Sequence, residues 1–409
     1  MSTQEGVPLA KTIKESHDGI SGDVPASVNK LYQILPKTTT PDQPWSGSGQ
    51  SVEFCFPSYL GKVIDCVLQF DIQITTSGAG GDLVLAPSTL FCDRREDVYA
   101  GQVFESQDSD QIHMSTLAYL TDQEFNTLRE SVNIGEDGSF NTGAPLAVSG
   151  TPTTKTFYLP VWSGIFHSVQ PFVRGFKDEW RLRFWMAKNG IIQSYSGIDN
   201  VTINCTNMAL WATEAQLDTQ NIASLTANHN QQIVYRGVIQ SKFTSAENTV
   251  SANGEYRKPL TTFTSDTAAL LLFVAPNSSA VADKLTKNAL QYVGFLDSGG
   301  AEIVQRLPDG LIRNYVQPET VPLSSYLSNP SINKFYVLPF CSNLQRVLEA
   351  GSVSGGLRLT GQEQIALLPP TTLSNVVVTA HAYEYAMLNV VKNNCSVIRS
   401  SGNPQLRRG

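Results

Sequence analysis

The chain has 409 residues, enough for two or more domains that each bury a hydrophobic core. Its net charge of −7 argues against a basic nucleic-acid-binding protein. Charged residues make up only 16% of the chain, and it contains 30 Gly and 21 Pro, a composition typical of turn-rich β proteins. The first residues lack the features of a secretion signal, and no apolar run reaches the ~18 residues of a membrane helix.

Catalytic and metal-binding patterns are not found in the sequence. The six cysteines are scattered without a Cys-x-x-Cys pair, which predicts buried free thiols and no disulfide framework or zinc site. The five histidines lack metal-ligand spacing, and Asp108–Asp110 lacks the Gly and Glu of a calcium loop, so a polar loop is expected there. No nucleophile elbow or phosphate-binding loop is present. We therefore expect no enzymatic activity, no cofactor and no catalytic, cofactor-binding or metal residues.

The first half of the chain shows a succession of strand patterns. Residues 1–48 are predicted to form an irregular arm. Apolar and polar residues then alternate over 65–74, and residues 90–105 predict a hairpin that turns at Ala100-Gly101. A capping box at Thr121–Glu124 predicts a helix to Val132, followed by a loop to residue 154. Two strands around Phe157 and over Trp180–Met186 come next.

A last strand at 201–212 and a connector with a short helix bring the first half to about residue 230. The second half repeats this order. It contains a buried strand at 270–274, a hairpin that turns at Gly299-Gly300, a short helix at Leu323–Leu327, and strands near 334–340, 355–369 and 375–385. The Phe-Tyr pairs at Phe157 and Phe335 lie 178 residues apart (335 − 157), so a duplicated β domain is predicted.

Three segments together resemble double jelly-roll major capsid proteins of the adenovirus-like lineage, most closely those of Polinton-like viruses and virophages. These segments are residues 93–105, residues 158–166 with 180–184, and residues 208–217. The resemblance implies an all-β fold of two tandem eight-stranded jelly rolls with short helices in loops. The implied parts are an N-terminal arm (1–48), a first jelly roll with its linker (49–230), a second jelly roll (231–391) and a C-terminal tail (392–409).

The resemblance also implies a function, that of a viral major capsid protein. Such a subunit forms a homotrimer, and the resulting pseudo-hexameric capsomer tiles an icosahedral shell. Its partners are neighbouring capsomers and the penton and minor capsid proteins, and it resides in the virion after synthesis in the host cytoplasm or nucleus. The alternatives are a carbohydrate-binding or carbohydrate-cleaving β-sandwich protein, because jelly rolls host both, and a minor capsid or penton protein.

Two groups of residues are candidates for contacts between subunits. Four aromatic residues lie in a predicted loop, where they either contact a neighbouring subunit or pack against their own sheet: Trp162, Phe166, Phe172 and Phe176. Three arginines nearby either pair with carboxylates of a neighbour or lie on a solvated strand face: Arg174, Arg181 and Arg183.

The tail is basic. After Val391 it contains four cations and no acid: Lys392, Arg399, Arg407 and Arg408. Two interpretations stay open, namely an inward-facing tail that meets the genome or an internal membrane, and a tail that docks on a neighbouring subunit.

Overall fold

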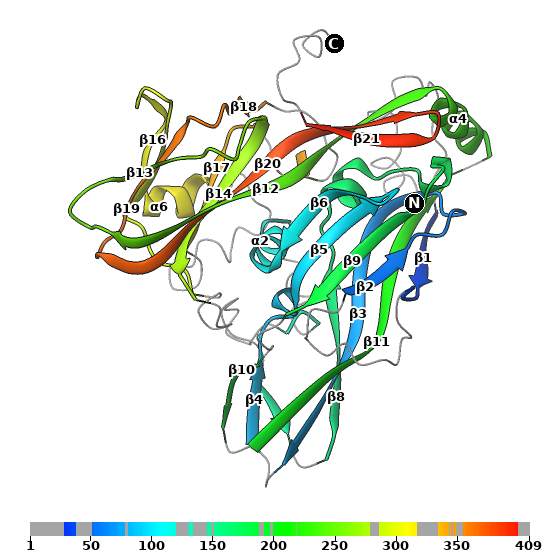
Figure 1. The fold of residues 1–409 in the computed structure, drawn as a ribbon, viewed down its shortest axis with the longest axis horizontal. Helices are drawn as coiled ribbons and strands as arrows, with labels where there is room; N and C mark the ends of the chain where they lie inside the picture. The colour runs from blue at the N-terminus through cyan, green and yellow to red at the C-terminus, as the bar shows by residue number, and fades with distance from the viewer. Residues whose placement is uncertain are drawn as a thin grey trace.

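Two antiparallel β-sandwiches lie side by side, one built mainly from each half of the chain (Figure 1). The computed structural model describes residues 28–37, 51–77, 81–119, 131–133, 145–148, 151–187, 192–196, 199–217, 219–278, 286–316, 334–342, 344, 347–348 and 355–399. Each sandwich is built from two sheets of four strands. Two further strands pair with inner strands of the second sandwich, and a separate three-stranded sheet accompanies the first. The predicted fold class, two tandem eight-stranded jelly rolls, is therefore confirmed.

The first roll has two facing sheets with strand orders β1-β11-β3-β8 and β2-β9-β5-β6. Its strands are β1 (Val28–Ile34), β2 (Ser51–Cys55), β3 (Lys62–Ser77), β5 (Cys92–Tyr99), β6 (Gln102–Asp108), β8 (Thr153–Pro160), β9 (Trp180–Met186) and β11 (Asp199–Gln216). The long strands β3 and β11 run on past the sandwich to the lower end of Figure 1. A small sheet of order β10-β4-β7 lies at this end, formed by β4 (Gly81–Leu85), β7 (Pro145–Val148) and β10 (Ile192–Ser196).

The second roll has sheets of order β12-β20-β14-β17 and β13-β19-β15-β16, and β18 and β21 add to β14 and β20. Its strands are β12 (Gln232–Val250), β13 (Tyr256–Pro259), β14 (Asp266–Pro276), β15 (Tyr292–Leu296), β16 (Glu302–Pro308), β17 (Phe335–Pro339), β18 (Leu357–Arg358), β19 (Gln364–Leu368), β20 (Leu373–Val391) and β21 (Asn394–Arg399). β14 lies between β20 and β17, and both of its faces are covered: Leu270, Leu272 and Val274 belong to one buried cluster and Leu271, Phe273 and Ala275 to another. Its apolar residues therefore form an unbroken run.

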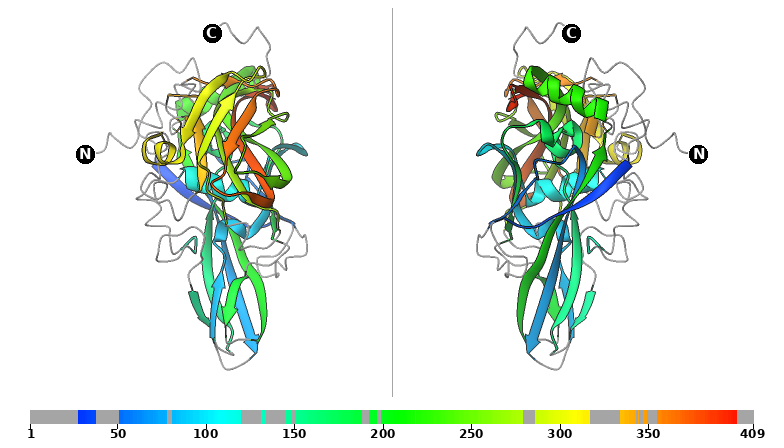
Figure 2. Two further views of the ribbon diagram at one scale, coloured as in Figure 1. Left: turned by 90° about the vertical axis from the view of Figure 1, so that its left-hand side faces the viewer. Right: turned by 90° about the vertical axis from the view of Figure 1, so that its right-hand side faces the viewer.

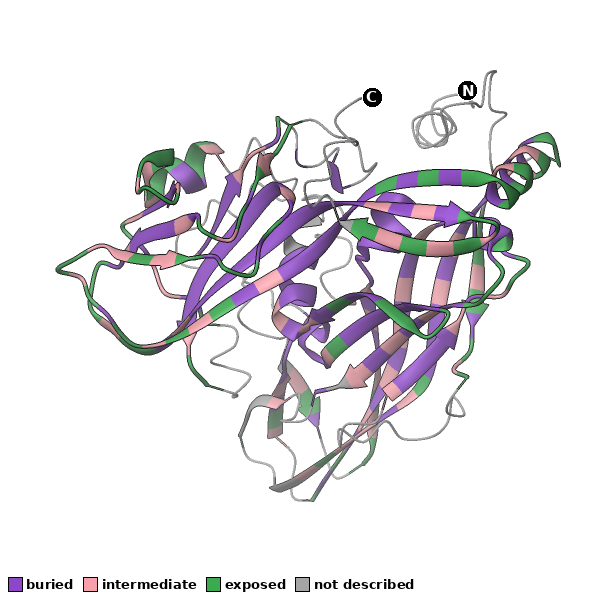
Figure 3. Ribbon diagram, turned by 45° about the horizontal axis from the view of Figure 1, so that its top comes forward, coloured by how far each residue is buried: buried purple, intermediate pink, exposed green. Residues whose placement is uncertain are grey.

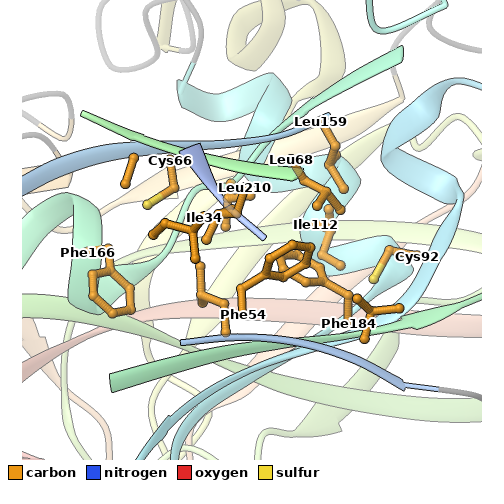
Figure 4. Close-up of a cluster of buried hydrophobic side chains, with 14 of the residues drawn as sticks. Ile34, Phe54, Cys66, Leu68, Cys92, Ile112, Leu159, Phe166, Phe184 and Leu210 are labelled. Atoms are coloured by element: carbon orange, nitrogen blue, oxygen red, sulfur yellow. The ribbon is translucent and has the colours of Figure 1, made fainter. Parts of the chain in front are cut away.

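Alternation along the strands builds the core of the first roll. On β3 every second residue from Cys66 to Ile74 is buried, as the sequence pattern predicted. Figure 4 shows Leu68 facing the second sheet, from which Phe54 and Phe184 project. The rings of Phe54 and Phe184 meet edge to face at 5.9 Å between centroids. Each such buried side chain stabilises the fold by about 1.5–3 kcal/mol relative to an exposed one.

The helical segments differ most from the sequence prediction. They are η1 (Ser88–Leu90), α2 (Ser109–Tyr119), η2 (Gly164–Val169), η3 (Val173–Gly175), α4 (Thr219–Asn230), α6 (Asp309–Leu311) and η4 (Ile312–Val316). The expected polar loop at Asp108–Asp110 is wrong, because α2 begins there. Asp108 Oδ1 accepts the Gln111 N–H at 3.0 Å, and Gln111 Oε1 accepts the Asp108 N–H at 3.2 Å, so the two residues cap the helix reciprocally.

Other predictions fare unequally. η2 and η3 occupy the stretch that was expected to be a loop, whereas α4 confirms the connector helix. The helices predicted at Thr121–Val132 and Leu323–Leu327 fall outside the described residues, apart from a turn at 131–133. The six cysteines are free thiols, as predicted. Among the described residues no helix has the length and apolarity to cross a membrane.

Both ends of the described chain are part of the sheets. β1 comes from the predicted arm and pairs with β11, and β21 comes from the predicted tail and pairs with β20. The turn between β20 and β21 is formed by Lys392 and Asn393, whose φ angles are 51° and 63°. The division into arm, two rolls and tail at residues 48, 230 and 391 stays a prediction.

The first roll contains a buried lysine. Lys62, at the start of β3, is 1% exposed, and within the described part of the chain its Nζ has no hydrogen-bond acceptor. Burial lowers the pKa of the Lys62 ammonium from its usual 10.5 to about 7. Between these two pH values the unfolded chain binds a proton at this position that the folded chain does not, so stability rises with pH over this range. Below pH 7 both states are charged and the destabilisation is complete.

We expect Lys62→Met to stabilise the fold at pH 7 by roughly 3–5 kcal/mol, because the variant buries no ammonium group. The gain should decrease as the pH approaches 10.5, the usual pKa of lysine. Denaturant unfolding across this pH range measures the difference, and Lys177→Met at an exposed lysine is the control. An equal pH dependence in Lys62→Met and wild type would contradict the prediction.

Candidate functional site

One pair of strands belongs to both rolls. β12 and β20 are each 19 residues long and pair along almost their entire length. Near one end Tyr235 and Leu388 are buried in the core of the first roll, and near the other Val250 and Val378 are buried in the core of the second. A continuous ladder of backbone hydrogen bonds therefore sets the position of one roll relative to the other. We call this pair of strands the ribbon.

Apolar side chains fill the junction between the rolls beside the ribbon. Trp162 follows β8 in the first roll and is 5% exposed. Its ring meets Tyr383 of β20 edge to face, at 5.8 Å between centroids. Met114 of α2 and Val238 of β12 belong to the same buried cluster. The rolls thus share an apolar contact in addition to the ribbon.

Glu105 of β6 forms hydrogen bonds with the free edge of the ribbon. Its carboxylate is buried and accepts the backbone N–H of Gln240 at 3.0 Å and that of Gly164 at 2.8 Å. Gln107 and the Arg95 guanidinium also donate to it, each at 3.2 Å. The Gln240 N–H points away from β20, to the edge of β12 that faces the first roll. The Glu105 side chain therefore links β5, β6, η2 and the ribbon.

Asp97 of β5 continues this polar network. It accepts a hydrogen bond from the Ser163 hydroxyl, whose oxygen caps η2 by accepting the Phe166 N–H at 3.1 Å. Burial, together with the negative charge of Glu105, raises the pKa of Asp97 to about 7, although Arg95 acts in the opposite direction. Asp97 and Glu105 are 0% and 2% exposed, so this pair of carboxylates fixes a turn and is closed to a substrate.

Ion pairs join α2 to the second roll. Lys242 of β12 pairs with Asp108 and lies 3.6 Å from Asp110. Lys287, which precedes β15, lies 3.5 Å from Asp110. The capped end of α2 therefore presents two carboxylates to two lysines of the other roll. Because these groups are partly shielded from solvent, the pairs are stronger than those on an open surface.

The turn of the last hairpin is anchored beside α4. The backbone N–H of Asn393 donates to the His229 carbonyl at 2.9 Å, and the Asn393 carbonyl accepts the Lys177 N–H at 2.9 Å. His229 is buried and shares a 2.5 Å hydrogen bond with the Tyr235 hydroxyl. Burial lowers the pKa of His229 to about 4, so it is neutral at physiological pH.

The four candidate aromatic residues are buried within the subunit. Phe166 stacks on Phe56 at 4.4 Å, and both Phe172 and Phe176 contact the His229 ring. Together with Trp162 they are 1–8% exposed. They pack within their own chain, and a contact of these residues with a neighbouring subunit stays a prediction.

The candidate arginines differ in their partners. Arg181 and Arg183 on β9 each lie 2.9 Å from Glu53 of β2, and Arg183 is also 3.3 Å from Glu96. Arg174 is exposed and has no carboxylate partner in the described part of the chain. Contacts of these arginines across a subunit boundary stay a prediction. In the tail, Lys392 is exposed, Arg399 is the last residue of β21, and Arg407 and Arg408 lie outside the described residues.

The residues that join the rolls were not predicted from the sequence, although the sequence at the start of α2 contains an indication of that helix. The stretch Asp108-Ser-Asp-Gln111 fits a capping box and could have located the start of α2. Arg95, Asp97 and Glu105 carried no such signal, because charged residues on a strand usually indicate an exposed face. In the described part of the chain, no group of three or more His, Cys, Asp or Glu side chains could hold a metal ion.

No protein-family model matches the chain, and no curated protein matches it. Solved structures do. A quasi-atomic structure of the PBCV-1 virus capsid matches with a TM-score of 0.69 and 14% identity, covering 91% of this chain and 96% of that one. The Faustovirus major capsid protein matches with a TM-score of 0.63 and 8% identity, covering 95% and 97%. The mavirus major capsid protein matches with a TM-score of 0.51 and 11% identity, covering 93% and 92%. The chain thus has the double jelly-roll fold of viral major capsid proteins.

We expect Gly164→Ala to destabilise the junction by about 1–3 kcal/mol, because a Cβ at this position would overlap the Val238 carbonyl oxygen of the ribbon. Gly254→Ala is the matched control, since nothing lies within 4 Å of the Cβ that it adds. Thermal unfolding should show a lower Tm for Gly164→Ala alone. Equal melting of the two variants would show that η2 does not pack tightly against β12.

We expect Glu105→Gln to cost about 3–5 kcal/mol, because it removes the carboxylate closest to the buried Arg95 guanidinium, to which Asp97 is the more distant partner at 3.7 Å. Glu179→Gln, at an exposed carboxylate paired with Lys37 and Arg181, should cost less than about 1 kcal/mol. Denaturant unfolding measures both variants. Similar losses for the two would mean that Glu105 is not the residue on which the junction depends.

Proposed function

We propose that this chain is a viral major capsid protein, a structural subunit and not an enzyme. Three copies form a pseudo-hexameric capsomer, and capsomers tile an icosahedral shell together with penton and minor capsid proteins. The observation that carries the proposal is that the ribbon joins two jelly rolls into one block. More than nine-tenths of this chain aligns with capsid structures of known viruses that have the same fold.

The rigidity of this block is what such assembly requires. A trimer imitates a hexagon only if each subunit presents two rolls at a constant angle, since a hinge between them would spread the capsomer edges over many positions. Here the ribbon, the Trp162–Tyr383 contact and the Glu105 hydrogen bonds all oppose a hinge. The presence of two rolls also favours a major capsid protein over a single-roll penton or minor capsid protein.

The carbohydrate-cleaving alternative receives less support. Glycosidases place two carboxylates on either side of an open sugar site. The buried carboxylate pair in the junction, Asp97 and Glu105, is bonded to the backbone and side chains of the turn around Ser163. These side chains perform a structural task.

Apolar residues at two distant places support a head-to-tail trimer. Tyr59, 64% exposed, lies against Tyr32 of β1, while Leu311 and Tyr315, 45% and 62% exposed, belong to the α6–η4 segment of the second roll. In Figure 1 β1 and α6 lie near opposite ends of the molecule, and in both views of Figure 2 they are on the same side of it. Two different surfaces on one side are what a closed heterologous ring requires.

We expect the purified wild-type chain to have the mass of a trimer by size-exclusion chromatography with light scattering. Electron microscopy of such trimers should show a hexagonal outline. A stable monomer, or a monomer that binds sugar, would overturn the proposed function.

Mixing two interface variants tests the head-to-tail arrangement. Tyr59→Asp and Tyr315→Asp should each be monomeric, because each lacks one half of the contact. A mixture of the two should form dimers and no larger ring, since only one intact contact can form between an unaltered Tyr315 surface and an unaltered Tyr59 surface. Val103→Asp, at an exposed apolar residue of β6, is the control and should remain trimeric. Trimers in either tyrosine variant alone would contradict the arrangement while leaving the wild-type trimer intact.

A further inference from the structure

The ribbon has an outer face where it covers the first roll. Ile233 and Tyr235 of β12 and Leu388 and Val390 of β20 point into the first-roll core, so the residues between them point outward. Figure 3 shows the alternation: buried with exposed positions along this part of β12, buried with intermediate positions along β20, and exposed with intermediate positions along β21. Nine residues in three cross-strand rows form the face: Gln232, Val391, Asn394; Val234, Asn389, Ser396; Arg236, Met387, Ile398. We call this set the ribbon face.

The ribbon face is apolar and slightly basic. Val234, Val391 and Ile398 are 37–40% exposed, which is high for apolar residues on a sheet that also covers a core. Arg236 supplies a positive charge, and none of the nine residues is acidic. No aromatic side chain is present on the face.

More cations lie where the ribbon ends. Lys392 occupies the turn that joins β20 to β21, and the Lys177 N–H donates to the carbonyl of the neighbouring Asn393. Arg174 precedes Lys177 by three residues. These three side chains are exposed and, like Arg236, have no carboxylate partner in the described part of the chain. We call these three residues the basic end.

The balance of charge here differs from that of the whole molecule. In the described part of the chain, the exposed acid adjacent to the basic end in the sequence is Asp178, set against Arg236 and the three cations of the basic end, whereas the whole chain has a net charge of −7. The nearby Glu179 is already paired with Lys37 and Arg181. Free cations concentrated at one end of an acidic protein orient that end towards an anionic partner.

We propose that the ribbon face and the basic end together bind the surface of an anionic lipid bilayer. Lysines and arginines near such a surface each contribute about fivefold in affinity. The valines and isoleucine between them can insert at the boundary of headgroups and acyl chains. A nucleic-acid backbone offers no such apolar layer. The absence of aromatic residues on the face also disfavours single-stranded nucleic acid, whose bases stack on such rings. This inference goes beyond the proposed function and does not depend on shell assembly.

Vesicle flotation of the purified full-length protein tests the inference. The probes are vesicles of phosphatidylcholine alone and of phosphatidylcholine mixed with phosphatidylserine, at low and at physiological salt. Wild type should float with the mixed vesicles and not with phosphatidylcholine alone, and added salt should weaken the binding. The double variant Lys177→Gln/Arg236→Gln should lower the partition coefficient about 25-fold, as expected for two lost cations.

Controls make the outcome decisive. Arg358→Gln removes an exposed cation of the second roll that also lacks a carboxylate partner in the described chain, and should change binding by less than about twofold. Val234→Ser should weaken binding to the mixed vesicles at both salt concentrations, because it removes apolar contact and no charge. Equal binding to both kinds of vesicle, or equal loss in Arg358→Gln and in the double variant, would overturn the inference. So would tighter binding to duplex DNA than to mixed vesicles, lost in the same double variant.

Discussion

A two-stranded ribbon that both rolls share determines the arrangement of the molecule. Its register is fixed twice, because Tyr235 and Leu388 are buried in one core and Val250 and Val378 in the other. A slip of one residue in either strand would remove a side chain from each core at the same time. The ribbon therefore transmits the geometry of one sandwich to the other without a hinge, and the remaining contacts between the rolls need only reinforce an arrangement that the backbone already sets.

The free edge of the ribbon would otherwise be a hazard. An unpaired strand edge is a template for another chain, and among the described strands β12 has no partner on the side away from β20. Side chains of the first roll occupy this edge. The Ser168 hydroxyl bonds the Val238 N–H at 2.9 Å and the Glu105 carboxylate bonds that of Gln240 at 3.0 Å. Polar groups of the first roll thus cover part of the free edge of β12. Subunits would then associate through side chains and not by pairing of this strand edge.

The sequence predicted the parts of the fold that depend on local pattern. The alternation along β3, the Ala100-Gly101 turn and the repeated Phe-Tyr strands all follow from period-two spacing or turn chemistry, and the structure has them where they were expected. The junction could not be predicted in this way. Arg95 bonds the Trp162 carbonyl, 67 residues away, and Glu105 bonds the Gln240 amide, 135 residues away. Burial of those charges is decided by distant partners, which no local pattern encodes.

The first roll includes residues from the far end of the chain. Leu388 and Val390 belong to its core, and Cys395 and Val397 of β21 pack against it. During synthesis this core therefore stays open until β20 has left the ribosome, although the rest of the roll was translated long before. A truncated product exposes apolar surface that chaperones and proteases recognise. Closure of the first roll therefore depends on the translation of β20, and a chain that ends before this strand leaves the core open.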